Sequence, residues 1–278
     1  MSFLVLLLVV WLEKFSNWRQ RIQHDGPWLR QLARVESDAR LAASPTLALL
    51  LLIALPLLAL GALLWLLHPL AYGWLALPVH LLVLLYSLGR GDLQNMLGSF
   101  RDAWRRGDGE AALLAAARDM QVEADEPHSL MLRVQDYLAW QAHQGFFAVI
   151  FWYALLGPLA ALGYRLLALC AERTQVPALR ERAEQLRHAL DWLPARALAA
   201  SLGLVGNFVA LNRVLLPELL NWPLPAARLV GDAVRAAGEC PAPQLGEAGV
   251  VCLDQLWQLL VRATLFWFAV FALWTLLV

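Results

Sequence analysis

The chain has 278 residues, of which 60% are hydrophobic and 16% are charged. An average soluble domain has about 45–50% apolar and about 25% charged residues, so a soluble enzyme is the weaker interpretation. The 22 basic and 22 acidic residues balance, which leaves no net field to attract nucleic acid. Long Leu/Ala/Val runs alternate with Arg-rich stretches. This alternation predicts an all-α, polytopic helical membrane protein with about four to six membrane-associated helices and a cytoplasmic helical region.

Residues 1–88 are predicted to form a short N-terminal helix, an amphipathic segment and a transmembrane hairpin. Met1–Leu12 is apolar but shorter than the roughly twenty residues that span a bilayer. The Arg-rich segment Glu13–Arg40 is expected to lie on the membrane face. Pro45–Leu67 and a second uncharged run through Leu88 are joined by a short loop without Lys or Arg, whereas both outer flanks are rich in Arg. The positive-inside rule therefore predicts a periplasmic tip for this hairpin.

Residues 89–144 form the main polar region and are predicted to be a cytoplasmic helical region. The Ala-rich centre, Glu110–Arg118, has high helix propensity. We expect interruptions near Gly107-Asp108-Gly109 and near Glu126-Pro127, because these residues break helices.

Residues 145–216 are predicted to contain a re-entrant or spanning hairpin, a basic segment and a packed helix. Gly157-Pro158 divides the apolar stretch Gly145–Cys170, so either one kinked helix spans the membrane or two half-helices re-enter it. The arginines that follow this stretch favour the re-entrant form, because both flanks then lie in the cytoplasm. Ala195–Leu216 is interrupted by Gly and Asn and is expected to pack against other helices.

Residues 217–258 are rich in Pro and Gly and poor in basic residues, which predicts a periplasmic loop before a C-terminal transmembrane helix at 259–278. Two of the three cysteines, Cys240 and Cys252, lie in this loop. A disulfide between them would persist in the periplasm, and two free thiols are an equally weighted alternative.

The motifs of common catalytic sites are incomplete. Gly89-Arg90-Gly91-Asp92 has the glycines of a phosphate-binding loop but no P-loop lysine and no preceding strand, which favours a helix exit from the membrane. No histidine pair has the i, i+4 spacing of a zinc helix, and no serine lies in a Gly-x-Ser-x-Gly elbow. The sequence therefore predicts no catalytic residue, no metal site and no cofactor.

Charged residues at expected membrane boundaries form the most informative constellation. Asp191 is expected to cap a helix that begins at Pro194, and Arg196 lies in its first turn, where the helix dipole disfavours a cation. An ion pair between Asp191 and Arg196 or Arg165 is weighted about equally with a ligand site. The complete candidate ligand or interaction site is Arg90, Asp92, Arg118, Asp119, Tyr164, Arg165, Asp191 and Arg196.

The order of these motifs carries a family resemblance. The motifs are Arg118-Asp119, Phe151-Trp152, Gly157-Pro158, Tyr164-Arg165 and Asp191-Trp192-Leu193-Pro194-Ala195-Arg196. In this order they resemble the AmpE family, within a superfamily shared with the cobalamin-pathway CobD/CbiB proteins. The resemblance implies an inner-membrane protein linked to the regulation of β-lactamase induction and, in genetic terms, to cell-wall recycling.

The chain departs from the cobalamin branch of this superfamily at the residues suited to amide ligation. That branch carries acids before its Pro-Leu-Phe-Trp-like segment, whereas this chain has Trp140, Gln141 and Gln144 there. Carboxylates for Mg²⁺ binding or general-base chemistry are therefore missing from the expected positions.

Three functions remain open on sequence grounds. The favoured one is an inner-membrane regulatory or signalling protein that acts without catalysis, through residues 90–144 and 173–187. The second is a residual ligase-like protein that binds a nucleotide or an amine, and the third is a small transporter, disfavoured because the spans carry few charges. The expected partners are the lipid bilayer and another inner-membrane or cytoplasmic regulatory protein, with no nucleic acid; homo-oligomer formation is left open.

Overall fold

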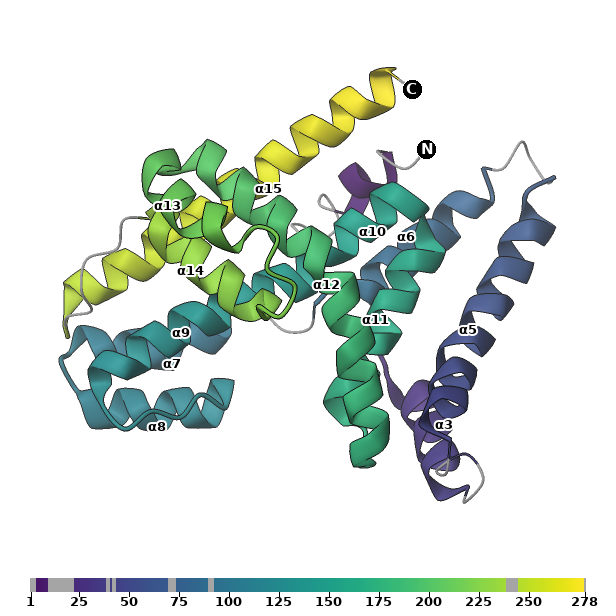
Figure 1. Cartoon of the computed structure of the whole chain (residues 1–278), viewed down its shortest axis with the longest axis horizontal. Helices are drawn as coiled ribbons and strands as arrows, with labels where there is room; N and C mark the ends of the chain where they lie inside the picture. Colours follow the sequence, from purple (N-terminus) through teal and green to yellow (C-terminus); the bar gives the residue numbers. More distant parts are fainter. Residues whose placement is uncertain are drawn as a thin grey trace. The chain divides into compact units, whose positions relative to one another are not determined.

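The computed structural model describes residues 4–9, 23–38, 41, 44–69, 74–89, 93–238 and 245–277. Every regular element in these ranges is a helix, which confirms the all-α prediction for them (Figure 1). The chain forms two compact units, each made of two chain segments. The first unit comprises Met1–Arg90 and Ala148–Asp191, and the second comprises Gly91–Phe147 and Trp192–Val278.

The first unit is organised around one central helix. Its helices are α3 (Gly26–Ser37), α5 (Pro45–Leu67), α6 (Ala76–Ser87), α10 (Ala148–Leu156), α11 (Pro158–Arg173) and the first part of α12 (Pro177–Val205). Helix α11 packs against α5, α6 and α10, and α3 packs against α5. Buried side chains from α3, α5, α11 and α12, among them Trp28, Leu52, Leu166 and Leu179, form its core.

The apolar stretch 145–170 is divided at Gly157, between α10 and α11. Gly157 has φ of 81°, a left-handed conformation that residues with a side chain rarely adopt, and Pro158 begins the next helix. The two helices pack against each other. The segment is therefore two helices in contact, and whether they span or re-enter a membrane stays a prediction.

Helix α12 corrects one sequence prediction, because Asp191 does not cap a helix that starts at Pro194. The helix runs unbroken from Pro177 to Val205 with Pro194 inside it. A proline removes the amide donor to the carbonyl four residues earlier, which is that of Leu190. The indole Nε1 of Trp152 donates to this carbonyl at 3.2 Å. A side chain from α10 thus supplies the hydrogen bond that Pro194 cannot make.

The second unit contains the polar central region together with the C-terminal part of the chain. Its elements are α7 (Leu93–Arg105), α8 (Gly109–Met120), α9 (Pro127–Ala142), the π-helix η2 (His143–Phe147), the remainder of α12, α13 (Phe208–Glu218), α14 (Ala226–Gly238) and α15 (Glu247–Leu277). Helix α7 packs on α8 and α15, and α14 packs on α9, α13 and α15. The interruptions predicted in 89–144 occur where expected, at Gly107 to Asp108 and at Glu126.

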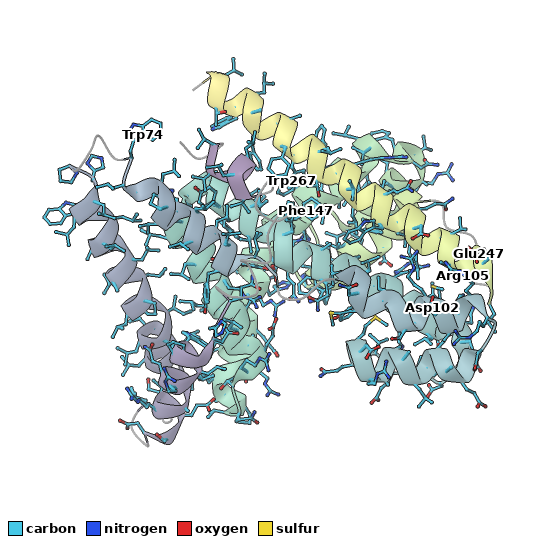
Figure 2. The ribbon with its side chains drawn as sticks, turned by 180° about the vertical axis from the view of Figure 1, so that it is seen from behind. Trp74, Asp102, Arg105, Phe147, Glu247 and Trp267 are labelled. Carbon is cyan, nitrogen blue, oxygen red and sulfur yellow. The ribbon has the colours of Figure 1, made fainter. Side chains whose placement is uncertain are left out.

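The segment predicted as a periplasmic loop, 217–258, is mostly helical, since it contains α14 and the first part of α15. It also contacts the segment predicted to be cytoplasmic. Arg105 Nε lies 2.9 Å from Glu247 Oε2, the Gly246 amide donates to the Trp104 carbonyl at 3.0 Å, and Figure 2 shows Arg105, Asp102 and Glu247 together. These contacts join the two segments directly, and the compartments predicted for 89–144 and 217–258 stay a prediction.

Two helices in the described ranges are long and apolar enough to cross a membrane, Pro45–Leu67 and Glu247–Thr275. Most of each helix is not buried inside the protein, and α5 exposes Leu50, Leu55 and Leu58. The apolar helix α6 is shorter. The four to six membrane-associated helices expected from the sequence therefore stay a prediction.

Candidate functional site

A buried polar cluster in the first unit joins α11 to α12. The hydroxyl of Tyr164 donates to Asp191 Oδ1 at 2.6 Å, and both residues are buried. Arg187 lies one helical turn before Asp191, with its Nε 3.4 Å from Asp191 Oδ2, and its Nη1 lies 3.6 Å from Glu172 Oε1. The cluster therefore places one guanidinium between two carboxylates and fixes α12 against α11.

Arg165 lies at the same level of α11 and is 4% exposed. Its Nε is buried and has no hydrogen-bond partner among the described residues. The charges around it are those of Glu172 and Arg187, and the phenols of Tyr86 and Tyr164 are also near. Because an incompletely paired buried charge is costly, Arg165 is the residue of this cluster best suited to meet a further negative group.

Arg196 has a structural role in the second unit. Its guanidinium donates to the carbonyls of Leu219 at 2.5 Å and Asn221 at 2.7 Å, which follow the end of α13. It also lies 4.0 Å from the centre of the Trp192 ring. A cation that binds carbonyls past a helix C-terminus satisfies acceptors that the helix leaves open. This contact gives Arg196 the separate partner that its position in the sequence required.

Arg118 and Asp119 form an exposed pair at the end of α8. Arg118 donates to both carboxylate oxygens of Asp119, at 2.7 and 2.9 Å, and to the hydroxyl of Ser99 at 3.2 Å. These hydrogen bonds hold the pKa of Asp119 below its ordinary value. The Arg118 side chain is 69% exposed, so the pair is available to a partner on the surface of this unit.

The six predicted residues that the structure describes do not form one site but lie in three groups. Tyr164, Arg165 and Asp191 belong to the first unit, and Arg118, Asp119 and Arg196 belong to the second. Arg90 and Asp92 lie outside the described residues, as does Cys240, so the disulfide stays a prediction. Its other half, Cys252, is buried in α15 and is not a free thiol.

The sequence reasoning missed two residues of the buried cluster, Glu172 and Arg187. Arg187 precedes Asp191 by four residues, the spacing that places two side chains on one helix face. That signal was present in the sequence, but it was hidden by the expectation that a new helix begins at Pro194.

The chain was compared with known protein families and structures. Residues 1–214 match the family described as regulatory signalling modulator protein AmpE. No curated protein and no solved structure gives a significant match. The matched range covers most of the chain and includes the whole buried cluster around Asp191. The chain therefore belongs to the AmpE family of regulatory signalling modulator proteins.

Proposed function

We propose that the chain is a multi-pass inner-membrane regulatory protein that acts in β-lactamase induction and peptidoglycan recycling, without catalytic chemistry of its own. The family match over residues 1–214 is the observation that carries the proposal, because the family is described by a regulatory signalling role. The polar contacts support a role without catalysis. Arg196 and Asp191 are engaged in helix-to-helix contacts, which stabilise the fold.

The exposed apolar helices support a location in the membrane. The core helix of a soluble protein is buried, whereas α5 has 23 residues and exposes leucines along its length. Trp65, near the end of α5, is also exposed. Trp74, before α6, is exposed as well (Figure 2). Indole rings at the ends of apolar helices are typical of the bilayer interface. The hairpin of α5 and α6 is the part of the chain that suits a bilayer best.

The contacts within the second unit support a topology with a single polar layer, that is, with the polar residues of its helices on one side of the membrane. Arg101 pairs with Asp254, and Arg235 pairs with Asp136, so α7 and α9 are bound to α15 and α14. The polar residues of these four helices then lie on one side of the membrane. Because they include many arginines, the positive-inside rule favours the cytoplasm.

Cysteine labelling in intact cells tests this topology. In a variant whose native cysteines are replaced by serine, Glu110→Cys and Arg228→Cys should react with a membrane-impermeant maleimide only after permeabilisation. Trp74→Cys, at the predicted periplasmic tip, should react without it. Labelling of positions 110 and 228 from opposite sides would contradict the single polar layer.

The regulatory role is tested on the exposed Arg118–Asp119 pair. The double variant Arg118→Ala/Asp119→Ala should impair β-lactamase induction while the chain is still inserted at normal level, because both side chains are on the surface. Arg213→Ala, an exposed arginine on α13, is the matched control and should leave induction unchanged. A normal response in the double variant would count against an interaction surface at this pair.

A further inference from the structure

A pocket of about 440 Å³ opens on the second unit and shares no residue with the buried cluster described above. Its walls come from the turn between α8 and α9, from α9 and from α14. They include Gln121, Glu123, Arg133, Asp136, Tyr137, Trp140, Arg228 and Arg235. The volume is in the range of about 300–1,000 Å³ typical of small-molecule sites.

One wall of the pocket is held by ion pairs between α9 and α14. Asp136 on α9 pairs with Arg235 on α14, and Arg235 also donates to Asp232 at 2.6 Å. Gly231 makes this approach possible, because a Cβ at that position would lie 2.2 Å from Asp136 Oδ1. The charges of Asp136 and Arg235 are therefore used to join the two helices.

Other polar groups of the pocket have capacity to bind a ligand. Arg133 donates through Nη1 to the Glu123 carbonyl at 2.6 Å and has no carboxylate partner among the described residues. Arg228 is 74% exposed, and its contact with Asp232 is long, at 3.8 Å. An exposed pair of this kind contributes little free energy and exchanges readily for a ligand. The guanidinium groups of Arg133 and Arg228 are thus available to bind an anion.

Aromatic side chains supply the second kind of surface. Tyr137 and Trp140 lie one turn apart on α9, and both line the pocket. Burial raises the pKa of Tyr137 above its ordinary value, and its hydroxyl carries a proton at neutral pH. That hydroxyl has no hydrogen-bond partner among the described residues and can donate one to a ligand. Beside them, Gln121 is the left-handed C-cap of α8, with φ of 57° and its amide donating to the Ala116 carbonyl.

We propose that this pocket binds a small organic oxyanion, a carboxylate or phosphate attached to a ring. The guanidinium groups of Arg133 and Arg228 would hold the oxyanion, since their planar forks match its geometry, and the ring would lie against Tyr137 and Trp140. Arg133, Arg228 and Arg235 are matched in number by Glu123, Asp136 and the adjoining Asp232, so the oxyanion would be held by individual guanidinium groups and not by a net positive charge. The proposal concerns binding alone and does not depend on the role in β-lactamase induction.

The test uses isothermal titration of the full chain in detergent with four probes. Phenyl phosphate and phenylacetate carry both features, and inorganic phosphate and acetate lack the ring. We expect saturable binding of at least one ring-bearing probe with a Kd on the order of 1 mM, and at least tenfold weaker binding of the matching ring-free ion. Whichever ring-bearing probe binds more tightly identifies the oxyanion as phosphate or carboxylate.

Variants assign the binding to the pocket. Arg228→Gln should weaken binding at least fivefold, because it removes one of the two guanidinium groups that would hold the oxyanion. The Arg228 side chain is exposed, so its loss does not threaten the fold. Trp140→Leu should weaken the ring-bearing probe and leave the ring-free ion unchanged. Arg106→Gln, an exposed arginine away from the pocket, is the control. No saturable binding, equal binding by Arg228→Gln and the wild type, or equal affinity for ring-bearing and ring-free ions would each overturn the proposal.

Discussion

The contact between Trp152 and the Leu190 carbonyl gives a sharp stability prediction. Trp152→Phe keeps an aromatic ring but removes the indole donor, which leaves a partly buried carbonyl without a partner. Such a loss costs about 1–2 kcal/mol. In a Pro194→Ala background the new residue has an amide that can donate to Leu190, so Trp152→Phe should cost close to nothing there.

A double-mutant cycle on the detergent-solubilised chain measures this coupling. We expect a coupling free energy of about 1 kcal/mol between positions 152 and 194, or roughly 2–4 °C in Tm for a domain of this size. The two backgrounds share the same loss of indole packing, so that contribution cancels. An equal cost of Trp152→Phe in the wild-type and in the Pro194→Ala background would refute the idea that Trp152 compensates for the proline.

Three further predictions use the same unfolding assay. Gly206→Ala should destabilise the chain by about 1–3 kcal/mol, because its Cβ would lie 2.7 Å from the Ala237 carbonyl oxygen. Gly98→Ala in α7 should instead stabilise the chain by about 0.5–1 kcal/mol, because no atom lies near the added Cβ. A change in stability of the same sign in both variants would contradict this packing. Asp191→Asn should lower the stability by about 3 kcal/mol, since Arg187 loses a buried countercharge. Tyr164→Phe should lower it by about 1 kcal/mol, since one hydrogen bond to Asp191 is lost. A smaller effect of Asp191→Asn than of Tyr164→Phe would argue against the ion pair. Glu247→Gln should change stability by less than about 1 kcal/mol, because its pair with Arg105 is exposed, and a larger loss would show that this contact is stronger than its exposure indicates.

Local sequence signals were sufficient to predict a helix break where the break depends on the residues at that position. The glycines at 107 and 157 mark chain reversals because both adopt positive φ, and Asp108 caps α8 by accepting from the Ala111 amide at 3.0 Å. Such features depend on a few neighbouring residues, so a single sequence reveals them.

Long-range contacts were not visible in the sequence. The continuity of α12 depends on a donor from Trp152, 42 positions away from Pro194 in the chain, whereas Pro194 alone indicates a helix start. The Pro and Gly residues around helix α14 predict a loop, although its buried Leu229, Val230, Ala233 and Val234 follow a helical period. The pocket needs α9 and α14 side by side, which no local pattern predicts.

The most direct test of the proposed regulatory role measures β-lactamase activity after exposure to an inducing β-lactam. The assay compares cells that lack this chain with cells complemented by the wild type, and the chain is quantified in the inner-membrane fraction. If the chain has this regulatory role, induction changes when the chain is absent and returns when it is restored to that fraction. Identical induction in both strains, with normal amounts of the chain in the membrane of the complemented cells, would contradict it.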